Sequence, residues 1–117
     1  MSRTTNRISL EQAAELVTSG ARACLAFVAD GLPRIEPVLA QYREDRFLAG
    51  IGPNSPQPDG EAVLVIDDGV QFFDLRAVYV RGTPVPIDES GAGRSWYEIR
   101  PKKVTCWDYG TLRVVDD

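Results

Sequence analysis

Short apolar segments, each closed by a turn signal, follow one another along most of the sequence and constrain its fold more than any other feature. The first runs over residues 23–29 (ACLAFVA) and ends at Asp30-Gly31, a dipeptide typical of β-hairpin turns. Because this run is almost continuously apolar, we expect a strand covered on both faces. The most hydrophobic segment, 62–66 (AVLVI), is expected to be a central strand. Closely spaced strands with hairpin turns favour a closed antiparallel barrel over an open sheet.

Proline and glycine interrupt this pattern at informative places. Pro37 lies inside the second predicted strand and indicates an edge position or a bulge, because proline cannot donate to a strand ladder. Gly82 indicates a bulge or a close backbone approach within a long strand. Residues 52–60, which contain three prolines, and residues 88–95 are expected to be loops. The strands predicted beyond the two named above are 34–42, 47–51, 75–85, 96–99 with 104–107 on either side of Pro101, and a short tail strand at 111–115.

One helix is predicted near the N-terminus, at about residues 9–19. Ser9 and Gln12 fit a capping box, and Gly20 supplies a stop at the other end. Its apolar positions form one stripe of mostly small side chains, so the helix should cover part of a sheet. With 117 residues and no internal repeat or linker, the sequence predicts a single domain, residues 1–117, with this helix and six or seven strands.

The absence of histidine from the sequence excludes several kinds of active site. Ser-His-Asp and Cys-His nucleophile systems, histidine bases and zinc motifs that contain histidine all need it. Gly91-Ala92-Gly93 lacks the third glycine and the flanking strand and helix of a dinucleotide-binding fingerprint. The paired acids, such as Asp67-Asp68, fall at turns, where aspartate favours the backbone geometry. No catalytic residue is therefore identified from these patterns.

Net charge and hydropathy bear on the partners and the compartment. The formal net charge is −4, which argues against nucleic acid as a partner, because phosphate backbones favour clustered lysine and arginine. No apolar run approaches the roughly 18 residues that a spanning helix needs. The first residues resemble no secretory signal, so we expect a cytoplasmic protein without a membrane partner.

The two cysteines, Cys24 and Cys106, both lie in apolar strand-like segments. Their spacing leaves a disulfide open, but no secretion signal supports one. We therefore prefer two structural thiols, since a free cysteine behaves as a small buried hydrophobe. Two thiols without histidine make a poor metal site, and no metal is expected.

Aromatic and basic residues alternate near the C-terminus, and two interpretations stay open. Aromatic side chains between basic ones can stack a planar ring and hold a phosphate. The same side chains also close barrels and form dimer interfaces, which is their commoner use. The residues concerned are Trp96, Tyr97, Arg100, Lys102, Lys103, Trp107 and Tyr109.

Three segments, taken in order, resemble the pyridoxamine 5'-phosphate oxidase-like split barrels. They are ACLAFVADGLPRIEPVLAQYREDRFLAGI, LRAVYVRGTPVPI and IRPKKVTCWDYG, and the resemblance covers roughly residues 10–110. It implies a six-stranded antiparallel split β-barrel. Together with the helix predicted above, the expected fold class is mainly β, a six-stranded antiparallel split β-barrel with one N-terminal helix. The resemblance also implies a homodimer that binds FMN or a deazaflavin in a groove between the subunits.

The resemblance also implies which residues would contact that cofactor, and where this sequence departs from the pattern. Glu36 stands at about the position of a phosphate-binding arginine, and residues 52–60 contain no basic side chain. Weak cofactor binding is therefore expected. The implied cofactor contacts are Arg34, Pro37, Val38, Gly50 and Trp107.

The sequence is compatible with two functions. The first is an oxidoreductase that depends on a flavin or deazaflavin. The alternative is a degenerate split barrel that has lost the cofactor and acts as a binding or structural dimer. The substrate does not follow from the fold.

Overall fold

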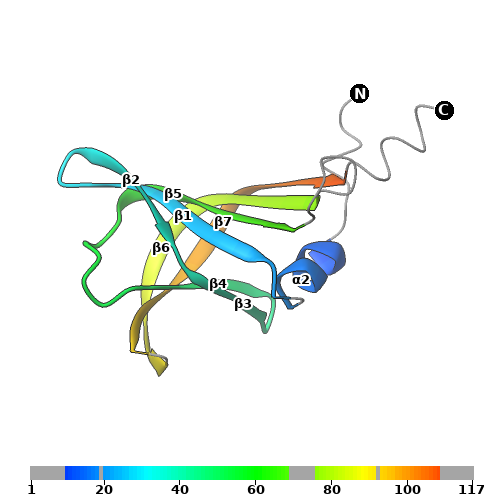
Figure 1. The fold of residues 1–117 in the computed structure, drawn as a ribbon, viewed down its shortest axis with the longest axis horizontal. Helices are drawn as coiled ribbons and strands as arrows, with labels where there is room; N and C mark the ends of the chain where they lie inside the picture. The colour runs from blue at the N-terminus through cyan, green and yellow to red at the C-terminus, as the bar shows by residue number, and fades with distance from the viewer. Residues whose placement is uncertain (1–9, 19, 69–75, 92, 109–117) are drawn as a thin grey trace.

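The computed structural model describes residues 10–18, 20–68, 76–91 and 93–108, and these form one helix and one antiparallel sheet of seven strands (Figure 1). The predicted cap at Ser9, the tail strand and Tyr109 lie outside these residues. The elements are α2 (Leu10–Thr18), β1 (Arg22–Ala29), β2 (Leu32–Pro37), β3 (Leu39–Arg43), β4 (Arg46–Ile51), β5 (Asp59–Asp68), β6 (Arg76–Gly91) and β7 (Arg94–Asp108). Within the described residues, no helix is long and apolar enough to cross a membrane.

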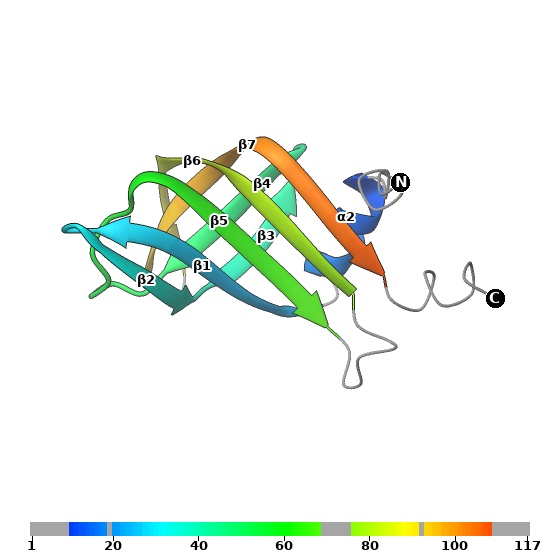
Figure 2. The same ribbon diagram turned by 90° about the horizontal axis from the view of Figure 1, so that it is seen from above.

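The strands follow the order β2-β1-β5-β6-β7-β4-β3 and curl into a half-barrel (Figure 2). The prediction of a single strand over 34–42 is wrong, because this segment forms parts of β2 and β3, at opposite edges of the sheet. Pro37 has no N–H to continue the ladder, and the N–H of Val38 donates to the Ala23 carbonyl instead, at 3.1 Å. One residue, Val38, thus joins the two edges, and this connection requires the sheet to curl.

The count of strands therefore differs from the six expected from the resemblance: the described residues form seven. The mainly β fold with antiparallel strands and one helix is confirmed, and so is the edge position of Pro37, which ends β2.

The core lies on the concave side of the sheet. In β1 the buried residues alternate, with Leu25, Phe27 and Ala29 facing inward, whereas Val28 is 41% exposed. The expectation that this strand is covered on both faces is therefore wrong for the chain described here. Helix α2 places Leu16 and Val17 in the same core and packs against β3, β5 and β6, so it covers part of the sheet as predicted (Figure 1). The central position predicted for 62–66 is confirmed, since β5 pairs with β1 and β6.

Strands β6 and β7 form a long hairpin that extends beyond the predicted strand ends. Residues 88–95 were expected to be a loop, but β6 continues to Gly91 and β7 begins at Arg94. The register shifts between Arg81 and Gly82, opposite Pro101, which confirms the bulge predicted at Gly82. The extension of the hairpin brings Arg94 and the residues after it alongside β4.

The two cysteines lie on opposite faces of the sheet and are free thiols. Cys106 is buried in the core, and burial raises the pKa of its thiol. Cys24 is half-buried on the convex side, where it pairs across strands with Val65. The burial expected of both thiols is thus found for Cys106 and only in part for Cys24.

Candidate functional site

Three of the five predicted cofactor contacts lie close together, where β2 passes into β3. Pro37 ends β2, Val38 makes the bend, and Leu39, the first residue of β3, pairs with Gly50 of β4. Val38 is buried and Pro37 is exposed. Arg34 lies three residues before Pro37, on the same face of β2 as Glu36.

Trp107 lies elsewhere along the sheet. Gly50 pairs with Trp96 of β7, and Trp107 is eleven residues further along the same strand, where it pairs with Ala77. At about 3.3 Å per residue, this places the two tryptophans roughly 30 Å or more apart along the strand. The side chain of Trp107 lies outside the described part of the structure, so the role of Trp107 as a cofactor contact stays a prediction.

The face of Gly50 that was expected to meet a cofactor ring is covered by the indole of Trp96. A Cβ on Gly50 would lie 2.8 Å from two ring carbons of Trp96, Cε2 and Cζ2. The two residues are direct partners across β4 and β7, and an aromatic ring laid over a cross-strand glycine shields its exposed backbone. Trp96 is 3% exposed, so its indole is packed tightly against the backbone of Gly50.

Replacing Gly50 with alanine is expected to destabilise the protein by about 1–3 kcal/mol, because the new methyl group would displace a tightly packed indole. Urea denaturation followed by tryptophan fluorescence measures this loss. Gly52→Ala is the matched control, since a Cβ there would meet only the Ser55 hydroxyl, at 3.8 Å, and its effect should stay within about 0.5 kcal/mol. Equal stability of the two variants would contradict the contact with Trp96.

Glu36 is held by neighbours on both carboxylate oxygens. The Ser55 hydroxyl donates to Oε1 at 3.2 Å, and Nε of Arg34 lies 3.5 Å from Oε2. Ser55 belongs to the segment between β4 and β5, so these contacts fasten this segment to the edge strand β2. The Glu36 carboxylate is thus part of a local polar cluster, and it also occupies Arg34.

A concave site lies next to Gly50, between the segment 52–58 and the end of the β6–β7 hairpin. Nη1 of Arg94 donates to the Gly50 carbonyl at 3.1 Å and lies at the wall of a cavity of about 290 Å³. We call this cavity the Arg94 pocket. It is lined by Gln57, Pro86, Ile87, Asp88, Arg94, Ser95, Trp96 and Tyr97.

Arg94 was not among the site residues predicted from the sequence, because 88–95 was interpreted as a loop. The signal that could have identified it is the string Arg-Ser-Trp-Tyr at 94–97, in which a cation directly precedes two aromatic residues. Burial raises the pKa of Tyr97, so its phenol stays neutral at physiological pH. The pocket therefore combines a guanidinium, the Asp88 carboxylate, neutral polar groups and aromatic surface.

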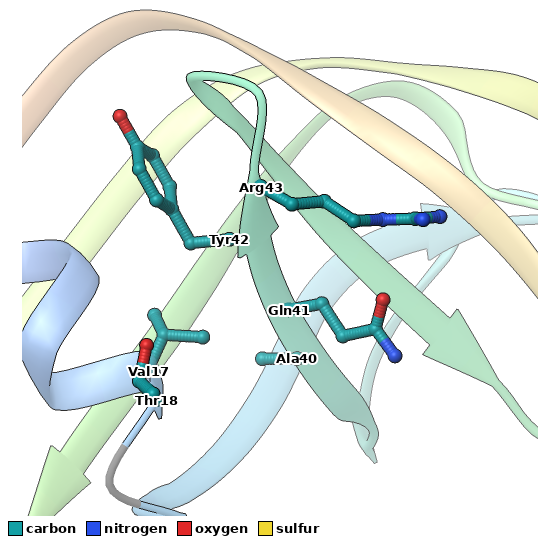
Figure 3. A pocket seen from close by; sticks show the side chains of 6 residues that line it. All are labelled: Val17, Thr18, Ala40, Gln41, Tyr42 and Arg43. Carbon is teal, nitrogen blue, oxygen red and sulfur yellow. The ribbon is translucent and has the colours of Figure 1, made fainter.

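A second cavity, of about 320 Å³, lies between the end of α2 and β3 (Figure 3). Two of its polar side chains already have partners: the Thr18 hydroxyl donates to the Ala14 carbonyl, and the Tyr42 hydroxyl donates to Asp45. Gln41 and Arg43 point away from the side chain of Tyr42, as Figure 3 shows. Burial and the Asp45 carboxylate raise the pKa of Tyr42. We interpret this cavity as a packing recess beside the helix and place the candidate site at the Arg94 pocket.

Comparison with known proteins shows the fold. No protein-family profile and no curated protein sequence matches this chain. Among solved structures, a conserved hypothetical protein from Mycobacterium tuberculosis aligns with a TM-score of 0.74 and 16% identity, over 91% of this chain and 88% of that one.

Two further structures carry names that refer to a cofactor or an activity. An FAD-binding protein from Mycobacterium smegmatis has a TM-score of 0.67 and 15% identity, over 86% of this chain and 94% of that one. A candidate pyridoxamine 5'-phosphate oxidase from Corynebacterium glutamicum has a TM-score of 0.64 and 12% identity, over 85% and 88%. At these identities the likeness is one of fold, and it confirms the split-barrel resemblance that the three sequence segments indicated.

Proposed function

We propose that the protein binds a flavin or deazaflavin, with FMN as the first candidate, and acts as an oxidoreductase that depends on it. The observation that carries this proposal is the Arg94 pocket, in which a half-buried guanidinium lies beside Trp96 and Tyr97. A cation next to aromatic surface suits a planar ring that carries a phosphate. The fold supports the proposal, because one of the structures that share it is named as an FAD-binding protein.

The residues of this chain fit such a cofactor in part. Arg94 would hold a phosphate, in place of the basic residues missing from 52–60. Gly50 offers no open wall for the ring, because Trp96 covers it, and Glu36 would repel a phosphate placed near β2. The pocket, at about 290 Å³, is at the small end of the roughly 300–1,000 Å³ typical of ligand sites, so a second subunit would have to complete it. A flavin supplies hydride transfer through its own ring, and the protein binds and orients it.

FMN is expected to bind with a Kd in the micromolar range or weaker, because losing two or three phosphate contacts of about 1.5–3 kcal/mol each removes much of the affinity. Titration of the purified protein with FMN, FAD and a deazaflavin, followed by flavin fluorescence and absorbance, measures the affinity. A Kd for FMN below micromolar would contradict this prediction, and no binding of any of the three would overturn the proposed function.

Variants of Glu36 test the electrostatic part of that expectation. Glu36→Gln keeps an acceptor for Ser55, removes the negative charge and releases Arg34, so FMN should bind up to about ten-fold more tightly. Glu44→Gln is the matched control, since it removes the same charge from an exposed turn between β3 and β4. If both variants leave the affinity unchanged, Glu36 has no part in the weak binding.

A second candidate is a split barrel without a cofactor, acting as a binding or structural dimer. The specific observation in its favour is Trp96, whose indole fills the space over Gly50 that a ring would otherwise use. The same titration separates the two, because this candidate predicts colourless protein and no flavin binding.

The convex side of the sheet presents an apolar surface, which we call the outer apolar face. Strand residues that point away from the core alternate with the buried ones, and pairs such as Ile35 with Ala26 and Val65 with Tyr79 place them side by side. Ile35 is 73% exposed, and Val28 and Tyr79 are each 41% exposed. The face consists of Cys24, Ala26, Val28, Ile35, Val63, Val65 and Tyr79.

Ion pairs border the outer apolar face at two ends. Arg22 and Asp67 pair at 2.9 Å at one end, and Glu61 pairs with Lys102 at 2.6 Å at the other. An apolar centre with a charged rim is the usual arrangement of a protein interface. We therefore propose that a second copy of the chain covers this face and that the protein is a homodimer. Contiguous exposed apolar patches larger than a few hundred Å² are rare on monomers.

A further inference from the structure

We propose that the Arg94 pocket binds a single oxyanion group, a carboxylate or a phosphate, carried on a small planar body. The inference concerns the same pocket as the proposed function but does not require a flavin, since the carboxylate of a substrate and the phosphate of a cofactor would both satisfy it. Three observations carry it: Arg94 has no carboxylate within ion-pair distance in the described residues, its side chain is anchored on the Gly50 carbonyl, and the pocket walls are polar and aromatic.

Arg94 differs from the other arginines whose ion pairs the structure shows. Within the described part of the chain, no carboxylate oxygen lies within 4.0 Å of it, and its one hydrogen bond goes to the neutral Gly50 carbonyl. The arginines that do pair with carboxylates are Arg22, Arg34, Arg46, Arg76, Arg81 and Arg100. A partly buried charge without a direct ion pair is unfavourable, so an anion that binds the guanidinium directly would be stabilised.

The geometry leaves the guanidinium able to bind that anion. A guanidinium carries five N–H donors in a planar fork, and the Gly50 carbonyl takes a bond from only one nitrogen, Nη1. The carbonyl fixes the position of the side chain without neutralising its charge. A planar fork matches two oxygens of a carboxylate or a phosphate, which favours an oxyanion over a halide.

The remaining walls of the pocket restrict what the anion can be attached to. Gln57 and Ser95 offer an amide and a hydroxyl, and Trp96 and Tyr97 offer aromatic surface. Asp88 also lines the pocket and disfavours a ligand with several negative charges, so a single oxyanion fits better than a polyphosphate. With about 290 Å³, the pocket encloses a small ring with its anionic group.

The test is a titration of the full chain with inorganic phosphate and, separately, with benzoate, followed by nuclear magnetic resonance at constant ionic strength. We expect both anions to shift the indole N–H of Trp96 and the amide of Gly50, and benzoate to bind more tightly because its ring meets aromatic surface. Arg94→Gln should weaken both by about ten- to hundred-fold. Arg100→Gln, which removes the same charge from an exposed position on β7, should leave both unchanged.

Two further variants keep the test decisive if Arg94→Gln is poorly folded. Arg94→Lys keeps the charge and loses the planar fork, so it should bind phosphate more weakly than the wild type and more tightly than Arg94→Gln. Asp88→Asn removes the opposing charge without touching Arg94, and should tighten anion binding by about two- to five-fold. Absence of shifts at millimolar anion, or equal shifts in wild type and Arg94→Gln, would overturn the inference.

Comparison of FMN with riboflavin separates this inference from the proposed function. If FMN binds more tightly than riboflavin, and Arg94→Gln abolishes the difference, both hold. If flavins bind but the variant leaves the difference unchanged, the inference fails while the proposed function stands. If no flavin binds, but benzoate binds in a manner that depends on Arg94, the proposed function fails and the inference stands.

Discussion

Replacing Gly82 with alanine should reduce the stability of the protein by more than about 4 kcal/mol, enough to unfold much of a domain of this size. A Cβ at this position would lie 1.9 Å from the Arg100 carbonyl oxygen and 2.9 Å from Cα of Pro101. Both are backbone atoms of the partner strand, so neither can rotate aside. The two strands would have to separate at the bulge, and β6 and β7 together connect the two halves of the sheet.

Urea and thermal denaturation measure this loss, and Gly60→Ala is the informative control. Gly60 has a positive φ of 83° and nothing within 4 Å of its would-be Cβ, so its substitution tests backbone strain without a clash. It should cost about 1–2 kcal/mol, clearly less than Gly82→Ala. If Gly82→Ala melts within a degree or two of the wild type, the close approach of Arg100 to Gly82 is wrong, and so is the register around it.

The features that the sequence predicted well are those set by local chemistry. Asp30 and Gly31 both have positive φ, 54° and 79°, as a tight hairpin turn requires. The bulge lies at Gly82 because only a residue without Cβ fits there. A glycine inside a strand-like segment is visible in the sequence, so the bulge could be predicted. The apolar run at 62–66 became an interior strand because it has the hydrophobicity to be buried.

The features that it missed depend on contacts between distant segments. Residues 34–42 have strand character throughout, and only the curling of the sheet shows that they belong to two edge strands, with Val38 between them. Residues 88–95 are polar and rich in glycine, as loops are, yet pairing across the hairpin keeps most of them in β6 and β7. Arg94 meets Gly50, 44 positions away in sequence, because β7 pairs with β4. No local sequence pattern predicts that contact.

Introducing a charge into the outer apolar face should convert the proposed homodimer into a monomer. Ile35→Asp and Tyr79→Asp are suited to this test, because both side chains are substantially exposed in one protomer and their replacement should leave the fold intact. A two-fold interface contains each substitution twice, so two uncompensated carboxylates would be buried per dimer. Burying one costs several kcal/mol, and two would weaken the association by many orders of magnitude.

Light scattering at micromolar concentration measures the outcome, with a mass of about twice 12.9 kDa expected for the wild type and 12.9 kDa for each variant. Leu39→Asp is the matched control: Leu39 is an exposed apolar residue, 44%, but it lies on β3, outside the outer apolar face, so this variant should remain dimeric. A wild-type mass of 12.9 kDa would overturn the proposed dimer. If Ile35→Asp and Tyr79→Asp remain dimeric, the interface lies on another surface, because a two-fold contact through the outer apolar face would bury two uncompensated carboxylates.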